Sequence, residues 1–420
     1  MKARFTPALF AHAEAVLAQL LRFDHPADAV VSRYFREHRE LGHADRGFVA
    51  ETVFAVLRRQ RSLTARCGEP VTPRRLLLAA LAVVRGWSLR EFAPVLKAAE
   101  ELWLAEVKAF RDEGLPPAVR DDMPDWLHAL LVAQYGEENV PRLVRAMNQA
   151  APLDLRANTL KTGRDDLRAA LAADGIVAEP TPYSPIGLRL RDKPALAKHP
   201  LFLGGHFEVQ DEGSQLLGAL LEARRGEMVV DFCAGAGGKT LLIGAQMRNT
   251  GRLYAFDVSD KRLSNLKPRL ARSGLSNVHP VRIEHERDAK VKRLAGKMDR
   301  VLVDAPCSGL GTLRRNPDLK WRQDETAVAE LNAKQTAILA AAATLVRPGG
   351  RLVYATCSLL TAENEAVVQD FLAKHPDFCL RPASEILAKQ GITLDGEMLR
   401  LLPHLHDTDA FFAAVLERQA

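Results

Sequence analysis

Two cysteines that directly follow apolar runs are the residues of this chain best suited to chemistry. Cys307 follows the run 300–303 in the motif Asp-Ala-Pro-Cys-Ser-Gly, which begins at Asp304, and Cys357 follows the run 351–354 in Ala-Thr-Cys-Ser. Both runs read as buried strands of an α/β sheet, and such sheets bind ligands outside the carboxyl ends of their strands. We therefore expect both thiols and Asp304 to face one cleft, where a deprotonated thiol can act as a nucleophile.

A glycine-rich loop upstream of the cysteines joins a predicted strand, 228–231, to a predicted helix, 240–247. Glycines let the backbone approach a ligand closely at a helix N-terminus. A Walker A loop needs glycine where Cys233 stands, and a dinucleotide fingerprint needs glycine where Thr240 stands, so neither pattern matches. The remaining interpretation is an S-adenosylmethionine loop, for which we predict cofactor contacts from Cys233, Ala234, Gly235, Ala236, Gly237, Gly238 and Lys239.

Acidic residues after successive strands support this interpretation. Asp231 ends the first strand, and Asp257 ends the second, about 20 residues past the glycines, where a carboxylate can accept hydrogen bonds from both ribose hydroxyls. Asp288 follows the next strand and is predicted to bind the adenine end, with Glu284 and Glu286 as close rivals. The alternative for the loop is a tight turn with a helix-capping Asp.

A thiol, an acid and a methyl donor in one cleft are what methylation of cytosine carbon 5 requires. Carbon 5 is a poor nucleophile until a thiolate adds to carbon 6, with an acid hydrogen-bonded to ring nitrogen 3. Carbon 5 then attacks the methyl group, a base removes the carbon 5 proton, and the thiolate leaves. Either Cys357 or Cys307 can be the thiolate, and Asp304 is placed to be the acid. The alternative is that a strand-end cysteine is only a small apolar residue.

The chain divides into three regions of different character. Residues 1–145 read as helices without a chemical motif, and residues 146–220 read as a small α+β module. In that module we expect Arg156 and Asn158 to contact a ligand. The alternative is that both face solvent on an edge strand. From residue 221 to 420 strands and helices alternate, which predicts a doubly wound, mostly parallel sheet.

The composition limits the kinds of partner and compartment that we expect for this protein. The net charge of +6 and the pI of about 9.1 favour a polyanion such as a nucleic acid, and we expect Arg314, Arg315 and Lys320 to contact its phosphates. The five cysteines form no Cys-x-x-Cys pair, which predicts no metal and a reducing compartment. The apolar runs are too short to cross a bilayer, so we expect a cytoplasmic protein that binds no membrane. Oligomeric state is not predicted.

These motifs together resemble bacterial RNA (cytosine carbon-5) methyltransferases of the RsmB/Fmu type. The matching stretches are 231–240, Asp257, 304–309, 314–321 and 356–358, and Ala236 stands where this family often has proline. Residues 156–158 resemble the RNA-facing module of the family, and residues 45–58 resemble its NusB-like helical extension.

The resemblance implies a Rossmann-like S-adenosylmethionine-dependent methyltransferase domain, preceded by a small α+β module and an all-helical NusB-like domain. It implies that Cys357 is the nucleophile and that Cys307 assists elimination and product release. The implied substrate is RNA, foremost 16S ribosomal RNA. Transfer RNA or 23S ribosomal RNA are the alternatives within enzymes, and a non-catalytic RNA-binding assembly factor is the alternative from another class.

Overall fold

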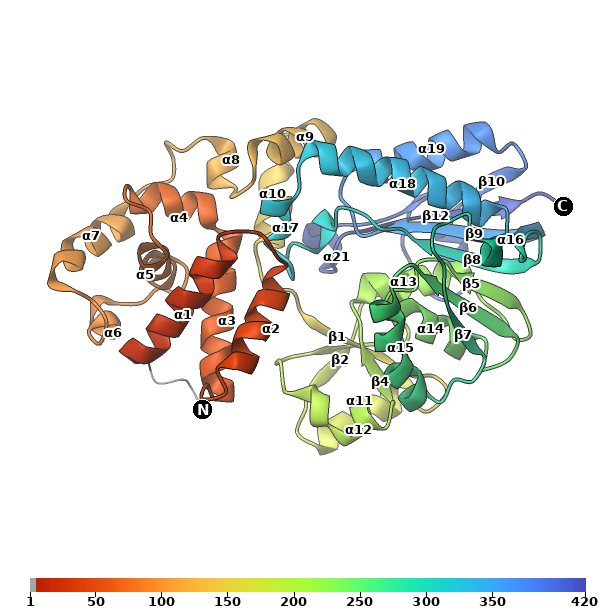
Figure 1. Ribbon diagram of the computed structural model, residues 1–420, viewed down its shortest axis with the longest axis horizontal. Coiled ribbons are helices and arrows are strands. Elements are labelled where there is room, and N and C mark those ends of the chain that lie inside the picture. The colour runs from red at the N-terminus through yellow and green to blue at the C-terminus, as the bar shows by residue number, and fades with distance from the viewer. Residues whose placement is uncertain (1–4) are drawn as a thin grey trace. The chain divides into compact units, whose positions relative to one another are not determined.

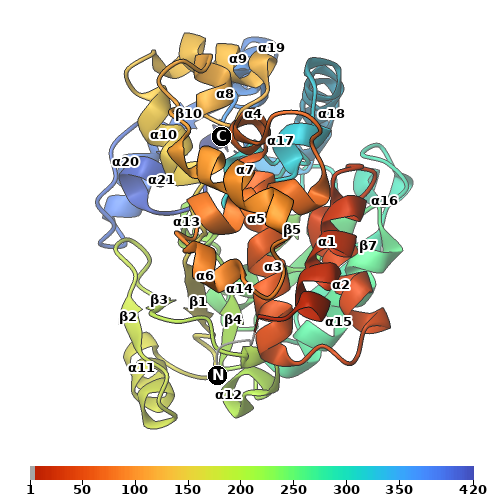
Figure 2. The same cartoon turned by 90° about the vertical axis from the view of Figure 1, so that its left-hand side faces the viewer.

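Apolar residues at helical spacing form a helical unit in the first part of the chain (Figures 1 and 2). The structure is a computed structural model that describes residues 5–420. Its chain up to residue 150 forms this unit together with residues 312–325, and residues 151–311 form a second unit with residues 326–420. The helices of the first unit are α1 (Pro7–Leu20), α2 (Ala27–Glu37), α3 (His43–Arg58), α4 (Gln60–Cys67), α5 (Pro73–Val83), α6 (Leu89–Phe92), α7 (Ala98–Ala109), α8 (Pro117–Arg120), α9 (Asp125–Tyr135), α10 (Val140–Met147) and α17 (Leu319–Arg322).

Helix α5 shows how local sequence starts these elements. The hydroxyl of Thr72 accepts a hydrogen bond from the backbone N–H of Arg75 at 3.2 Å, and Pro73 occupies the first turn, where its missing N–H costs nothing. Residues 76–82 are all buried, so α5 runs through the core of the unit.

Residues 312–325 lie in the helical unit, although the sequence analysis assigns them to the region 221–420. The indole N–H of Trp321 donates to the carbonyl of Leu57 at 2.9 Å. The carboxylate of Asp318 accepts a hydrogen bond from the backbone N–H of Ala27 at 3.1 Å. A fragment that began near residue 145 would therefore leave this segment without its partners.

The predicted phosphate-binding patch in this segment is wrong for two of its three residues. Arg314 is 5% exposed and Lys320 is fully buried, so neither side chain presents its charge to solvent. The ammonium of Lys320 donates to the carbonyl of Arg58 at 2.9 Å and to the amide oxygen of Asn148 at 3.1 Å. Burial lowers the pKa of Lys320 to about 7, although nearby Asp122 opposes the shift. Both residues are part of the helical unit's interior.

The second unit begins with the small module, an antiparallel sheet in the order β2-β3-β1-β4. Its strand β1 lies between β3 and β4, inside the sheet. The alternative that Arg156 and Asn158 face solvent would require β1 to be an edge strand. Arg156 donates to the side chain of Gln210 at 2.5 Å and to the carbonyl of Gly238 at 2.7 Å. Asn158 donates to the carbonyl of Ser273 at 2.9 Å. Both side chains are buried and join the module to the larger sheet, so the prediction that they contact a ligand is wrong. The elements of the module are β1 (Leu153–Ala157), α11 (Arg164–Ala173), β2 (Ala178–Pro180), β3 (Gly187–Leu190), η1 (Leu196–Lys198), α12 (Pro200–Leu203) and β4 (Phe207–Val209).

The larger sheet of the second unit is doubly wound, as predicted (Figure 1). Its path is β10-β12-β9-β8-β5-β6-β7, and β11 pairs with β12. The pairs among β5 to β9 are parallel, whereas β12 pairs antiparallel with its neighbours. The strands are β5 (Met228–Asp231), β6 (Arg252–Asp257), β7 (Val278–Arg282), β8 (Met298–Asp304), β9 (Val346–Thr356), β10 (Phe378–Arg381), β11 (Leu399–Leu401) and β12 (Phe411–Arg418). The helices are α13 (Glu212–Leu221), α14 (Gly238–Gln246), α15 (Asp260–Ser273), α16 (Ala289–Lys292), α18 (Glu325–Ala343), α19 (Glu365–Lys374), α20 (Ala383–Ala388) and α21 (Pro403–His406), with the short turns η2 (Leu310–Thr312) and η3 (Thr361–Glu363).

Alternating strand residues build a core on each face of this sheet. Val303 and Tyr354 pack with α18 and α19 on one face, and Leu302 and Val353 pack with α13 and α20 on the other. Strands buried on both faces read as continuous apolar runs, which is why the sequence pattern identifies them. Residues 348–350 form an irregularity within β9, where its register with β8 shifts.

The pairing of β8 with β9 positions the cysteines. The two strands are parallel neighbours, with Asp304 opposite Ala355, so both chains leave the sheet at the same edge. Within residues 5–420, no helix is both long enough and apolar enough to cross a membrane.

Replacing the buried ammonium of Lys320 tests the correction in the helical unit. We expect Lys320→Met to lower the free energy of unfolding by about 1–3 kcal/mol, because it leaves two buried oxygens without a donor. Chemical denaturation measures this change. The matched control is Lys267→Met, which removes an exposed ammonium on α15 and should change stability little. Equal stability of the two variants would contradict the buried role of Lys320.

Candidate active site

The two cysteines lie together at the edge where β8 and β9 end. Their sulfur atoms are 3.4 Å apart. The backbone N–H of Gly311 donates to the carbonyl of Cys357 at 2.9 Å. A Cβ at Gly311 would lie 2.6 Å from that carbonyl oxygen, so only glycine allows this close approach. The structure thus brings together the two thiols that the strand-end positions predict to share a cleft.

Burial and neighbouring groups act on the thiol of Cys307. The hydrogen bond with Cys357 and burial hold the pKa of the Cys307 thiol well above its usual range, and the carboxylate of Glu363 adds to the shift. Either sulfur atom can donate the hydrogen bond of this pair. The order of the two thiols stays what the family resemblance implies, with Cys357 as the nucleophile.

Asp304 forms an ion pair with a lysine of the glycine-rich loop. The ammonium of Lys239 donates to a carboxylate oxygen of Asp304 at 2.7 Å. Burial alone lowers the pKa of Lys239, but the charge of Asp304 and this hydrogen bond outweigh it, and the pKa lies above its ordinary value. Lys239, predicted as a cofactor contact, is thus a charged partner of Asp304 in this structure.

A cavity of about 690 Å³ opens beside Asp304 and Cys307, and Cys357 is not among the residues that line it. Several residues predicted for the cofactor or the chemistry line it, namely Cys233, Gly235, Asp257, Asp304 and Cys307. Lys239, together with Ala234, Ala236, Gly237 and Gly238, lies outside this lining. The residues that the sequence analysis missed are Phe232, Val258, Arg262, Ile283, His285, Pro306, Lys334 and Ile338. Lys334 and Ile338 come from α18, for which no local motif signals a ligand.

Asp257 organises the glycine-rich loop. Its carboxylate accepts hydrogen bonds from the backbone N–H of Gly235 at 2.9 Å and of Ser259 at 2.8 Å. Gly237 has a φ of 85°, and a Cβ there would lie 2.1 Å from a methyl carbon of Leu266. The glycines of this loop therefore serve helix packing as well as the approach of a ligand.

Asp288, predicted to bind the adenine end, lies outside the cavity lining in this structure, and its contact with the cofactor stays a prediction. Its carboxylate accepts hydrogen bonds from the backbone N–H groups of Glu284 and Lys290, at 2.9 Å and 2.8 Å. Its rivals Glu284 and Glu286 line the cavity. These glutamates come within four residues of the end of β7, and this proximity is the signal that could have ranked them first.

The chemistry of the lining fits S-adenosylmethionine. Apolar side chains such as Ile283 and Ile338 offer a slot for a flat base, and Asp257 offers a carboxylate for ribose hydroxyls. Glu284, Glu286 and Asp304 bring further acidic groups to the cavity, which suits a ligand that carries a sulfonium charge.

Asp231 lies beneath the loop and is fully buried. Burial raises its pKa to about 7, although the hydrogen bond from the hydroxyl of Thr240, at 2.6 Å, opposes the shift. The charge of Asp304 also contributes to the rise.

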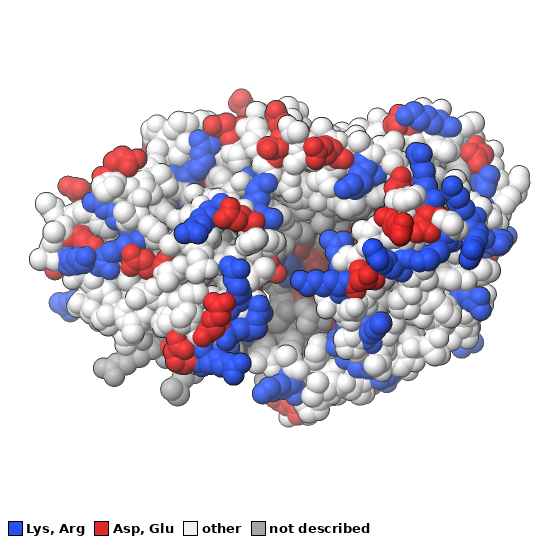
Figure 3. All heavy atoms as spheres, in the orientation of Figure 1, with Lys and Arg blue, Asp and Glu red and all other residues white. Residues whose placement is uncertain are grey.

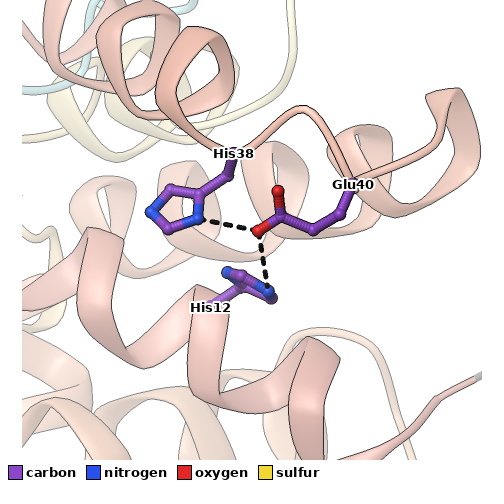
Figure 4. Close-up of side chains that lie close together, drawn as sticks. All are labelled: His12, His38 and Glu40. Atoms are coloured by element: carbon purple, nitrogen blue, oxygen red, sulfur yellow. Dashed lines mark hydrogen bonds and ion pairs between the residues drawn. The ribbon is translucent and has the colours of Figure 1, made fainter.

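A separate cluster in the helical unit contains groups that can bind metals (Figure 4). Among residues 5–420, His12, His38 and Glu40 form a group whose potential metal-ligating atoms all lie within 4.8 Å of one another. Glu40 is exposed and pairs with His38 at 2.8 Å, and the hydroxyl of Tyr34 bonds to His12 at 2.9 Å. These contacts account for the cluster without an ion, and the absence of a metal stays a prediction.

The parallel sheet, the glycine-rich loop at the end of β5 and the acidic cavity beside it define an S-adenosylmethionine-dependent methyltransferase domain. Comparison with known protein families supports this assignment. Residues 218–417 match the family described as 16S rRNA methyltransferase RsmB/F, and residues 123–196 match the RsmF/B-like ferredoxin-like domain. The chain belongs to the RsmB/F methyltransferase family.

Individual relatives give the extent of the similarity. The chain is 34% identical to the probable ribosomal RNA small subunit methyltransferase B of Synechocystis sp., over 96% of this chain and 98% of that protein. The crystal structure of PH0851 superposes with a TM-score of 0.81 at 26% identity, covering 100% of both chains. A methyltransferase homologue from Pyrococcus horikoshii has a TM-score of 0.61 at 30% identity, covering 72% of this chain and 100% of that one.

Asp257 provides a test of the cofactor cavity. We expect Asp257→Ala to weaken S-adenosylmethionine binding by about 2–4 kcal/mol, because a carboxylate that accepts two hydroxyls makes charged hydrogen bonds. Isothermal titration calorimetry measures the affinity. The control is Asp260→Ala, which removes an exposed carboxylate three residues away. If Asp257→Ala binds the cofactor as tightly as the control does, the ribose assignment fails.

Asp231 provides a pH test. Between about pH 4 and 7 the folded chain holds a proton on Asp231 that the unfolded chain has lost, so this group makes stability fall as pH rises. Asp231→Asn removes this titration. The difference in melting temperature between variant and wild type should therefore shift in the variant's favour from pH 5 to pH 8. A difference that is the same at both pH values would contradict the raised pKa.

Proposed function

We propose that this protein transfers a methyl group from S-adenosylmethionine to carbon 5 of a cytosine in RNA. The observation that carries the proposal is the pair of sulfur atoms at 3.4 Å, since Cys307 of that pair lines the cofactor cavity together with Asp304. One nucleophile, one proton carrier and one acid are the groups that this reaction needs.

In the proposed reaction, the thiolate of Cys357 donates an electron pair to carbon 6, and the carbon 5–carbon 6 π electrons move to carbon 5. Asp304 acts as the acid: it passes a proton to ring nitrogen 3, which stabilises the charge that spreads onto the ring, and takes the proton back when the ring is restored. Lys239 pairs with the carboxylate that remains in between. The bound cofactor supplies the methyl group to carbon 5. The carbon 5 proton then leaves to a base, its electron pair restores the double bond, and the sulfur–carbon bond breaks with its electrons returning to Cys357. Cys307 assists this last step.

Charge on the second unit supports an RNA substrate. Exposed lysines and arginines gather around α16 (Figure 3), among them Lys290, Lys292, Arg293 and Lys297. They follow closely after the cavity-lining residues 283–286 in the chain. We assign phosphate contact to this group in place of the buried Arg314 and Lys320.

We further propose 16S ribosomal RNA as the substrate and the cytoplasm as the compartment, because the relative from Synechocystis is named for the small ribosomal subunit. The thiol pair and the Lys239–Asp304 ion pair favour an enzyme over a non-catalytic assembly factor. Bisulfite sequencing of total RNA from a deletion strain distinguishes 16S ribosomal RNA from 23S ribosomal RNA and transfer RNA.

The two thiols give the decisive prediction. Without Cys357 no bond to carbon 6 forms, so Cys357→Ala should be inactive and yield no protein–RNA adduct. Without Cys307 the attack and the methyl transfer still occur, but the adduct persists. Cys307→Ala should therefore accumulate a covalent RNA complex on denaturing gels, with radiolabelled methyl groups in the RNA.

Two outcomes would overturn this assignment. An adduct with Cys357→Ala but none with Cys307→Ala would reverse the roles of the thiols. Unchanged activity in both variants would make both cysteines structural. The matched control is Cys379→Ala, which changes a cysteine on β10. This variant should methylate RNA as the wild type does and accumulate no adduct.

A further inference from the structure

A buried carboxylate that is absent from the predicted site lies between the two cysteine turns. Glu363, the last residue of η3, is fully buried. One of its oxygens accepts a hydrogen bond from the backbone N–H of Ser308 at 2.8 Å. The other accepts from the hydroxyl of Ser308 at 2.5 Å and from the hydroxyl of Ser358. A buried carboxylate requires such donors, because leaving it unpaired is costly.

Each of these serines directly follows one of the cysteines. Ser308 follows Cys307, and Ser358 follows Cys357, so a single carboxylate holds the turn that carries each thiol. The hydroxyl oxygens of the two serines are 3.3 Å apart, close to the 3.4 Å between the two sulfur atoms. The serine pair and the sulfur pair therefore bridge the same two turns.

A helix on one face of the sheet completes the enclosure of Glu363. The amide of Gln335, on α18, donates to Glu363 at 2.9 Å and to the carbonyl of Pro306 at 3.0 Å. The hydroxyl of Tyr354, on β9, donates to the backbone carbonyl of Glu363 at 2.6 Å. Glu363 is thus tied to β9, to α18 and to both turns.

We propose that Glu363 is a positioning residue that sets the separation and orientation of the two thiols by holding both cysteine turns. The inference rests on the proposed function, because the separation of the thiols matters only if both act on one adduct. A displacement of about 1 Å in a reacting group can cost on the order of 100-fold in rate.

The two arms of the carboxylate have separate consequences. The arm to Ser358 holds the turn of the nucleophile, so its loss should slow attack on carbon 6. The arm to Ser308 holds the turn of the assisting thiol, so its loss should slow breakdown of the adduct. A carboxylate with only a general structural role would not divide its effects in this way.

The experiment measures adduct formation in a single turnover, with full-length protein, S-adenosylmethionine and a 16S ribosomal RNA transcript. In the Cys307→Ala background, we expect Glu363→Ala to slow adduct formation by about 10–100-fold while cofactor affinity stays within about twofold. Glu363→Gln should restore part of the rate, because its amide keeps an acceptor for the Ser308 N–H and donors for the hydroxyls.

The matched control is Glu212→Gln, which changes another buried carboxylate. Glu212 accepts hydrogen bonds from the backbone N–H groups of Tyr183 and Ser184, both at 2.6 Å. This control should lower the melting temperature without slowing adduct formation. If Glu363→Ala forms the adduct as fast as the control does, the positioning role is wrong. If Cys307→Ala itself forms no adduct with Glu363 intact, the proposed function fails instead.

Serine variants keep the inference testable if Glu363→Ala does not fold. Ser358→Ala in the Cys307→Ala background should slow adduct formation. Ser308→Ala with both thiols intact should raise the steady-state level of adduct. Ser273→Ala, which removes a buried hydroxyl bonded within α15, should do neither. Serine variants that match this control in both measurements would overturn the proposal.

Discussion

The parallel pairing of β8 with β9 is the constraint on which the candidate site depends. Adjacent parallel strands lie about 4.8 Å apart, and their carboxyl ends meet at one edge. With Asp304 opposite Ala355, a thiol placed three residues past the end of β8 can meet a thiol placed directly after β9. A shift of one residue in this register would turn side chains to the opposite face and separate the sulfur atoms.

Buried charge is paired at each step around this edge. The Lys239–Asp304 ion pair brings the glycine-rich loop to the end of β8, and Asp257 holds the same loop through the backbone N–H of Gly235. Glu363 makes the corresponding contacts for the cysteine turns. Groups of this kind are costly to bury without partners, so their networks favour one arrangement of the loops over others.

Buried polar groups in the helical unit are also hydrogen-bonded to partners far away in the sequence. Lys320 and Trp321 come from a segment that follows the cysteine turn of β8 in sequence, yet their side chains are satisfied by carbonyls of Arg58 and Leu57. Basic residues near a catalytic motif in sequence are therefore not necessarily at its surface, because burial depends on which unit the segment joins.

The sequence by itself determined the elements with strong local signals. Strands buried on both faces appear as apolar runs, the cap at Thr72 marks the start of α5, and the glycine-rich loop with Asp257 predicts the cofactor cavity. Strand-end positions are enough to place Cys307 and Cys357 together, because parallel strands share a carboxyl edge. The resemblance to the RsmB/Fmu type added an order for the thiols that spacing alone left open.

Tertiary structure decided what depends on residues far apart in the chain. The sequence analysis named no individual strand after the run 351–354, so it missed β12, which pairs antiparallel with β9. The signal for such an added antiparallel strand is a partner and not a local pattern. Glu363 and Gln335 carry no motif, and their roles come from packing against the cysteine turns. Arg156, Asn158 and Lys320 were misassigned for the same reason: a polar side chain that is buried and hydrogen-bonded to a distant segment looks identical in sequence to one that faces a ligand.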